Sequence, residues 1–174
     1  MVHSCAAGSQ RADALPSPAV VSRARMRVVV QRVNEAHVTV GEETTGAISM
    51  GLLVYLGAAD GDGPSDVAYI VNKLAGLRVF GDEGGKMSLG PAEVGAELLV
   101  VSQFTLFGDL RRGRRPSWGG AAPPEEAERL YDEVVASLRS HGFKVETGRF
   151  RADMRVHSVG AGPVTILLDS RKLF

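Results

Sequence analysis

Four consecutive residues near the middle of the chain have side chains that could act on a substrate. Ser102-Gln103-Phe104-Thr105 directly follows the apolar run 98–101, so two hydroxyls and an amide stand where a buried strand is expected to end. Free backbone N–H groups at such a strand end can stabilise a developing oxyanion, and loss of one such donor costs roughly 3–4 kcal/mol of transition-state stabilisation. The alternative is that these polar side chains only satisfy the end of the strand.

A glycine-proline pair near the C-terminus is the second candidate. Gly162-Pro163 stands immediately before the apolar run 164–168. Proline at the start of a strand gives up a ladder hydrogen bond, and an X–Pro bond is the one peptide bond for which the cis form costs only about 0.5–1 kcal/mol. A cis bond here would turn two adjacent carbonyls the same way. The alternative is an ordinary tight hairpin turn.

The densest basic run of the chain follows the first candidate segment. Arg111, Arg112, Arg114 and Arg115 surround Gly113 and precede Pro116-Ser117-Trp118. Such a loop suits contacts with phosphates beside a reactive centre. The alternative is a solvated arginine-rich loop with no ligand.

The usual catalytic and metal-binding motifs are missing from the sequence. None of His3, His37, His141 and His157 is placed to serve as a base for Ser102 or Thr105, and Cys5 is the single cysteine. The chain has no Gly-x-Ser-x-Gly elbow, no His-Glu-x-x-His pair and no Walker-type loop. We therefore expect no triad, no metal and no cofactor.

The elements that must position these residues follow from the apolar pattern. Alternating apolar residues predict strands over 27–33, 37–40, 44–48 and 52–58 in an antiparallel meander, and a hairpin over 77–80 and 86–89. A buried strand is expected over 97–106, and closing strands over 143–147, 154–159 and 164–169, the last two joined by 160–163. Apolar residues at helical spacing predict helices after Pro64 and after Pro124, the second of them structural. The expected fold class is α+β, with an antiparallel, barrel-like core and two covering helices.

Composition limits the class of protein and the number of domains. The chain has 174 residues, 44% of them hydrophobic, and no apolar run long enough to span a membrane. Residues 1–25 lack periodicity and read as a disordered extension, with an organelle-targeting peptide as the less favoured alternative, and 26–174 form one domain. Three arginines against Asp13 give that extension a charge of +2 and leave −2 from Met26 onward. Any contact with nucleic acid must therefore be local, and a cytoplasmic location is expected.

Several motifs together resemble the D-aminoacyl-tRNA deacylase family, the bacterial and eukaryotic type that proofreads mischarged tRNA. The resemblance runs from Met26 to Phe174. It rests on Gln31-Arg32-Val33, Gly51-Leu52-Leu53-Val54, Gly85-Lys86-Met87, Ser102-Gln103-Phe104-Thr105-Leu106, Arg112-Gly113 with Arg115-Pro116-Ser117, Gly148-Arg149-Phe150 with Met154, and Gly162-Pro163-Val164-Thr165.

This resemblance implies a hydrolase that cleaves a D-amino acid, or glycine, from the 3′-terminal adenosine of tRNA. It implies a homodimer with the active site at the subunit interface, in which a cis Gly162-Pro163 of one subunit enters the partner's pocket and excludes L-amino acids. Catalytic roles fall on Ser102, Gln103, Phe104 and Thr105, where backbone N–H groups near Phe104 hold the ester carbonyl. Further binding roles are implied for Arg32 at the Gly-Pro element, and for Phe150, Met154, Arg112, Arg114 and Arg115 toward tRNA. The 2′-hydroxyl of the adenosine would make DNA a poor substitute.

The sequence shows two departures from the family pattern and leaves four alternatives open. The family usually has Asn-Asp before Gly-Pro, where this chain has Gly160-Ala161, and Asn is common where Ser88 stands. Thr105 could be a covalent nucleophile rather than an orienting group, and Arg32 could form only a surface ion pair. Two other functions compete with the editing hydrolase: a tRNA-end-binding protein without hydrolysis, and a hydrolase of small D-amino acid esters.

Overall fold

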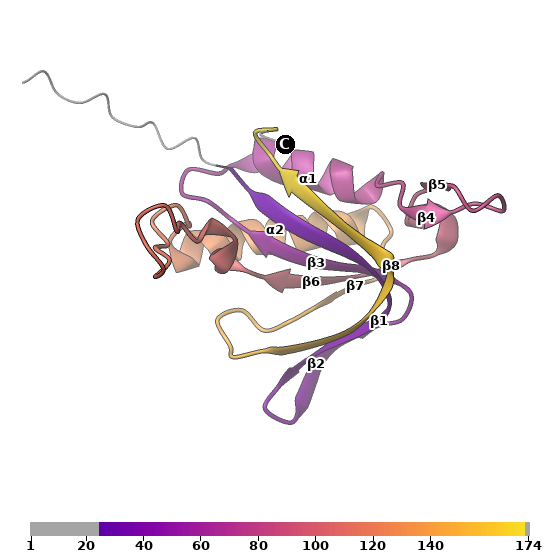
Figure 1. Cartoon of the computed structure of the whole chain (residues 1–174), viewed down its shortest axis with the longest axis horizontal. Helices are drawn as coiled ribbons and strands as arrows, with labels where there is room; N and C mark the ends of the chain where they lie inside the picture. Colours follow the sequence, from indigo (N-terminus) through magenta and orange to yellow (C-terminus); the bar gives the residue numbers. More distant parts are fainter. Residues whose placement is uncertain (1–24, 173–174) are drawn as a thin grey trace, which may run out of the picture.

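A strongly curved, six-stranded sheet flanked by two helices forms the body of the molecule (Figure 1). The computed structural model describes residues 25–172. The elements are β1 (Arg27–Val40), β2 (Glu43–Ile48), β3 (Gly51–Gly57), α1 (Pro64–Ala75), β4 (Phe80–Gly81), β5 (Met87–Leu89), β6 (Glu97–Ser102), α2 (Pro124–Ser140), β7 (Val145–Thr147) and β8 (Arg155–Asp169). The expected extension lies, except for Arg25, outside the described residues. No helix within 25–172 is long and apolar enough to cross a membrane.

The first strand is continuous and organises the sheet. β1 pairs antiparallel with β3 through its first half, with β2 through its second half, and with β8 along both. The prediction of two strands around Asn34-Glu35 was wrong, because the chain stays extended there. Register shifts between Gln31 and Glu35 mark a bulge instead, and a bulge keeps a strand paired while changing which side chains face the core.

The sheet is mixed, although the barrel-like sheet with two helices is confirmed. β3 pairs parallel with β6, and β6 pairs parallel with β7. Parallel neighbours need a crossover connection, and α1 and α2 lie in the two crossovers. β3 pairs with β1 and not with β2, so the expected antiparallel meander was wrong at this strand.

Two apolar cores lie on opposite faces of this sheet. The larger core packs α1 and α2 against the sheet around Leu52, Leu98 and Leu130. The smaller core fills the inside of the curve around Leu53, Leu99 and Val38. β3 and β6 are buried on both faces, which accounts for their nearly uninterrupted apolar sequences.

The far side of the barrel closes through a backbone contact. A Cβ atom placed on Gly46 of β2 would lie 2.4 Å from the carbonyl oxygen of Thr147 in β7. Glycine is therefore the residue that lets the two strands come this close.

The last strand is an edge strand that carries the glycine-proline pair. β8 is one strand, so the predicted turn over 160–163 was wrong. Between the pairs Val33↔Gly160 and Gln31↔Thr165, β1 advances by two residues while β8 advances by five, so the segment around Gly162-Pro163 bulges out of the ladder. β8 pairs with β1 alone, and an edge strand tolerates the missing N–H of proline.

Candidate functional site

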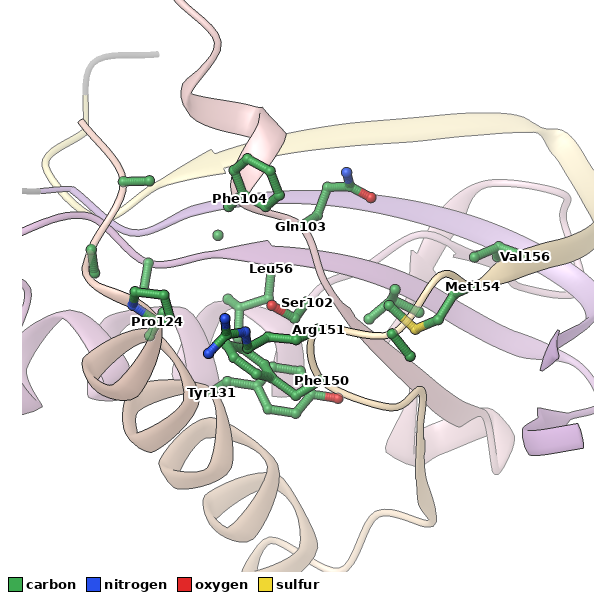
Figure 2. Close-up of a pocket in the computed structure, with 17 residues that line it drawn as sticks. Leu56, Ser102, Gln103, Phe104, Pro124, Tyr131, Phe150, Arg151, Met154 and Val156 are labelled. Atoms are coloured by element: carbon green, nitrogen blue, oxygen red, sulfur yellow. The ribbon is translucent and has the colours of Figure 1, made fainter. Parts of the chain in front are cut away.

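A pocket of about 510 Å³ opens where β6 ends. Its walls come from the ends of β3 and β6, the start of α2, and the loop between β7 and β8 (Figure 2). It is lined by Leu56, Gly57, Ala58, Val101, Ser102, Gln103, Phe104, Ala121, Ala122, Pro124, Ala127, Tyr131, Phe150, Arg151, Ala152, Met154 and Val156. Five predicted site residues thus meet in one pocket, from two segments about fifty residues apart in sequence: Ser102, Gln103, Phe104, Phe150 and Met154.

The strand that delivers these residues is shorter than predicted. β6 ends at Ser102, and Phe104–Phe107 forms a 3₁₀ turn in place of the expected strand to Leu106. The backbone N–H of Gln103 donates to the carbonyl of Leu56 at 2.8 Å, which fixes the turn to the end of β3. The N–H groups of Phe104 and Thr105 come next, and neither bonds a carbonyl of the described chain.

Gly57 forms the floor under this turn. A Cβ atom at Gly57 would lie 2.8 Å from the carbonyl oxygen of Gln103 and 2.9 Å from the ring of Phe107. Because both neighbours belong to the turn, a larger residue at position 57 would displace the backbone N–H groups that follow.

The polar side chains of the turn interact with each other. The side-chain amide of Gln103 donates a hydrogen bond to the hydroxyl of Thr105. Thr105 itself is exposed and lies beside the pocket rather than in its lining. No histidine, aspartate or glutamate lines the pocket, so no side chain there is suited to remove the proton of the Thr105 hydroxyl.

The second helix contributes a wall, which revises its interpretation as purely structural. Pro124, Ala127 and Tyr131 of α2 line the pocket. The hydroxyl of Tyr131 donates to the carbonyl of Val100 at 2.8 Å. Burial raises the pKa of Tyr131 well above its ordinary value, so this phenol stays neutral and supports the wall.

The loop between β7 and β8 covers one side of the pocket with aromatic and sulfur groups. The ring of Phe150 lies 6.2 Å from that of Tyr131, centroid to centroid. Met154 packs over Gly148, where a Cβ atom would lie only 2.5 Å from its sulfur. An aromatic ring and a polarisable thioether both suit contact with a nucleobase.

The Gly-Pro element lies apart from the pocket of its own chain. Gly162 and Pro163 are exposed, the bond between them is cis, and neither residue lines the pocket. Arg32 braces the segment, since its Nε donates to the carbonyl of Ala161 at 3.1 Å and its Nη1 to the carbonyl of Val79. Arg32 therefore holds the backbone before Gly162 and forms no ion pair within the described chain.

The arginine-rich loop is anchored at its start and exposed beyond it. Arg111 pairs with Asp109 at 2.6 Å, and these contacts lower the pKa of Asp109. Arg112, Arg114 and Arg115 are exposed and lie outside the pocket lining. The loop returns at Trp118, whose ring meets Phe104 edge-on at 5.3 Å, so it lies next to the pocket mouth.

A buried aspartate, Asp62, lies in the loop that follows β3. Asp62 accepts a hydrogen bond from the N–H of Ala59 at 2.7 Å, and its other oxygen has no partner in the described chain. Burial raises the pKa of Asp62 to about 7, and nearby Asp66 and Asp169 add to this shift. Within residues 25–172, no group of three or more histidine, cysteine or carboxylate side chains is arranged to hold a metal ion.

The pocket also contains residues that the sequence analysis missed. Ala121, Ala122 and Ala127 are small and apolar, and nothing in their type points to a binding site. Arg151 is different, because it stands between the motif residues Phe150 and Met154. Its position in that motif was the available signal.

Comparisons with known proteins bear on this site. A family model described as D-Tyr-tRNA(Tyr) deacylase matches residues 29–169. A D-aminoacyl-tRNA deacylase of Thermotoga petrophila is 57% identical, and one of Anaeromyxobacter dehalogenans 58%, each over 149 residues that cover 86% of this chain and all of the relative.

Two solved structures have the same fold. A structure titled c-Myc DNA unwinding element binding protein is 40% identical, with a TM-score of 0.77 over 82% of this chain and 97% of that one. A probable eukaryotic D-amino acid tRNA deacylase is 17% identical, with a TM-score of 0.74 over 83% of this chain and 99% of that one, and shows the fold alone.

Proposed function

Because this chain belongs to the D-aminoacyl-tRNA deacylase family and hydrolyses D-aminoacyl-tRNA, we propose that its pocket binds the aminoacylated 3′-terminal adenosine. The observation that carries this proposal is the meeting of Ser102, Gln103 and Phe104 with Phe150 and Met154 around one cavity. The adenine ring packs against Phe150 and Met154. The ester then lies beside the 3₁₀ turn.

The turn supplies the electrostatic part of catalysis. The N–H groups of Phe104 and Thr105 donate to the ester carbonyl oxygen as it gains negative charge, and Gln103 and Ser102 fix the backbone that presents them. Water attacks the carbonyl carbon and a tetrahedral intermediate forms. Collapse then breaks the bond to the ribose 3′-oxygen, which takes up a proton and leaves as free tRNA. An aminoacyl ester is already activated, so orientation and polarisation suffice, and the neighbouring 2′-hydroxyl assists the water.

A water nucleophile fits this pocket better than a covalent mechanism through Thr105. The Thr105 hydroxyl accepts a hydrogen bond from Gln103, and no acid or base side chain lines the pocket. A covalent route needs an activating base next to the hydroxyl. Thr105 therefore orients the Gln103 side chain.

The active site is completed by a second copy of the chain. β8 pairs on one side only, and its exposed residues include Val159, Leu167 and the Gly162-Pro163 bulge. A sheet edge of this length with apolar side chains favours pairing with another protein surface. We assign that surface to the pocket side of the partner, which places the Gly-Pro carbonyls beside the bound amino acid.

This arrangement selects the hand of the substrate by exclusion. Substrates with different D side chains are all accepted, so selectivity comes from rejecting the L form. Exchange of hand at Cα swaps the directions of hydrogen and side chain. Rigid carbonyls that bind the amino group then leave no room for an L side chain. Glycine has no side chain and passes this filter.

The arginine-rich loop contributes affinity for the tRNA body. Arg112, Arg114 and Arg115 are exposed next to the pocket mouth, where the acceptor stem continues from the terminal adenosine. Their contacts with phosphate carry no sequence information, so one enzyme can serve several tRNAs.

The decisive experiment follows ester loss from D-Tyr-tRNA, L-Tyr-tRNA, Gly-tRNA and free D-tyrosine ethyl ester. We expect rapid cleavage of D-Tyr-tRNA and Gly-tRNA and slow cleavage of the other two. Equal efficiency on the free ester would contradict a site built around the adenosine. Binding of tRNA without turnover would contradict the hydrolytic role of the turn.

Complementation between two inactive variants tests the dimeric site. Gly57→Val displaces the catalytic turn. Gly162→Val adds a side chain to the element that enters the partner's pocket, so it blocks D and L substrates alike, unlike a change at Arg32 that only loosens the bulge. When equal amounts of the two variants are refolded together, half of the dimers contain one chain of each. Each mixed dimer has one intact site out of two, so about a quarter of wild-type activity should return. If both elements act within one chain, the mixture stays inactive.

A further inference from the structure

Arg151 stands out among the residues that line the pocket. It is the one charged side chain among the seventeen lining residues. Figure 2 shows it in the loop between β7 and β8, with its side chain extended along the pocket beside Phe150. The other lining groups are apolar or neutral, so this guanidinium dominates the local charge.

The backbone of Arg151 has a conformation that favours glycine. Its φ angle is 60°, and in the described chain only Lys172 among the other non-glycine residues also has a positive φ. The left-handed region costs a residue with a Cβ atom roughly 1–2 kcal/mol, which glycine avoids. Outliers of this kind concentrate at functional sites, because the surrounding structure must hold them in place.

The guanidinium of Arg151 is free to bind a ligand. Arg151 makes no hydrogen bond or ion pair within residues 25–172, and its side chain is exposed. By contrast, two other arginines already have partners. Arg149 pairs with Glu43 at 2.8 Å, and Arg32 donates hydrogen bonds to two backbone carbonyls. Arg151 is thus a strained, unpartnered cation at a neutral pocket.

The chemistry of the substrate identifies the anion that this cation would meet. The ester and the adenine are uncharged, and the amino group of the amino acid is cationic or neutral. The nearest fixed negative charge is the phosphate on the 5′ side of the terminal adenosine. A guanidinium binds phosphate oxygens in a bidentate, charge-assisted way.

We propose that Arg151 binds the phosphate on the 5′ side of the terminal adenosine and thereby sets the depth at which the nucleoside enters the pocket. This inference rests on the proposed function, because it assumes that the adenosine occupies this cavity. Arg151 contacts substrate away from the reacting atoms, so its contribution should appear mainly in KM.

The test compares two small substrates that differ by one group. 3′-O-D-tyrosyl-adenosine lacks the phosphate, and the same ester of adenosine 5′-monophosphate carries it. For the wild-type protein we expect kcat/KM to be about tenfold higher on the phosphorylated ester, through a lower KM. Arg151→Gly should reduce this ratio to about one. A ratio that stays at the wild-type value in Arg151→Gly would overturn the proposal.

Matched variants separate phosphate binding from charge and folding effects. Arg149→Ala removes a positive charge from the same loop at a residue paired with Glu43 and should keep the wild-type ratio. Arg151→Gly should unfold at the same temperature as wild type or higher, because glycine suits the positive φ. If Arg151 only covered the pocket, Arg151→Gly would accelerate both esters equally, which also overturns the proposal.

A second measurement uses the natural substrate. On D-Tyr-tRNA, the slope of log kcat/KM against log salt should become shallower by about 0.7 in Arg151→Gly, as expected for one lost contact to single-stranded nucleic acid. An unchanged slope would overturn the proposal. Failure of wild type to cleave D-Tyr-tRNA would instead contradict the proposed function, so the two failures are distinguishable.

Discussion

The pocket at the end of β6 and the bulge in β8 are built on different principles. The pocket turn is anchored on β3 through the hydrogen bond from Gln103 to Leu56. It packs so closely against Gly57 that a Cβ atom there has no room. The Gly162-Pro163 bulge stands on an edge strand, is exposed, and is held from its own chain chiefly by Arg32. Under the proposed function, one chain therefore supplies the turn that polarises the ester and, on the exposed edge strand β8, the element that selects the substrate of the partner.

This difference separates two properties of the enzyme. Changes under the turn should lower the rate on every substrate, because they displace the N–H groups of Phe104 and Thr105. Changes to the residue that holds the Gly162-Pro163 bulge, Arg32, should alter the ratio of D to L cleavage and leave the rate on D substrate largely intact. The following variants test this separation.

The largest effect is expected from Gly57→Ala. The added methyl group would lie within 3 Å of the Gln103 carbonyl and the Phe107 ring, so the turn must move. We expect kcat on D-Tyr-tRNA to fall about a hundredfold, the effect of losing an oxyanion donor. The control is Gly81→Ala, where a Cβ atom meets nothing within 4 Å. Wild-type kcat in Gly57→Ala would show that the turn is not the catalytic element.

Arg32→Ala should affect selectivity instead of rate. It removes the donor to the carbonyl of Ala161 and frees the bulge. We expect the ratio of kcat/KM for D-Tyr-tRNA over L-Tyr-tRNA to fall about tenfold, with kcat on the D substrate changed by less than about twofold. Arg78→Ala, at an exposed ion pair with Glu93, is the matched control. Equal losses on both substrates would mean that Arg32 has only a structural role.

A smaller effect is expected on the pH dependence of stability, and it comes from Asp62 in the loop that follows β3. The pKa of Asp62 is raised in the folded state to about 7, above the 3.8 of the unfolded chain, so folding takes up a proton between these values. Its contribution to stability is therefore fully present below pH 4 and is lost as pH rises through 7. Asp62→Asn should remove this loss and stabilise the fold at pH 8 by about 1–2 kcal/mol.

Urea unfolding at pH 5 and pH 8 measures this change. Asp62→Asn should gain stability over wild type at pH 8 and gain less at pH 5. The same offset at both pH values would mean that Asp62 is ionised throughout and that the substitution acts by packing.

Thr105→Ala should have the smallest effect. The Thr105 hydroxyl only accepts a hydrogen bond from Gln103, so its loss should reduce kcat by less than about threefold. Serine at the same position is the control that keeps the hydroxyl. A loss of several orders of magnitude in the alanine variant, restored by serine, would contradict the minor orienting role of this hydroxyl and favour the covalent route.

The sequence was sufficient to predict five of the residues that line the pocket and insufficient to predict their backbone conformation. Ser102, Gln103 and Phe104 follow a buried run and were placed correctly at its end, but the strand was extended to Leu106 because apolar residues continue through the turn. Gly160-Ala161-Gly162-Pro163 has the composition of a turn, and only the pairing with β1 identifies a bulge in one strand. Local patterns do not record which strand is the partner.

The lining from α2 and the role of Arg151 could not be predicted for a different reason. Ala127 and Tyr131 lie on the apolar face of a helix, and that pattern is the same for a core and for a pocket wall. The positive φ of Arg151 is a property of the folded loop, since arginine rarely adopts it elsewhere. That the Arg151 guanidinium has no partner within residues 25–172 can likewise be known only from the folded structure.

The pairing of the first strand with the last has a consequence for how the protein is made. Arg27 lies opposite Asp169, so β1 meets its longest partner only after almost the entire chain has been synthesised. A topology with such distant partners folds slowly, because a large loop must close before the contacts form. Until then the β1 edge that β8 covers stays open, and nascent chains in a crowded polysome can pair there with one another. Slow folding after synthesis, and dependence on chaperones that shield β1, are therefore expected of this fold.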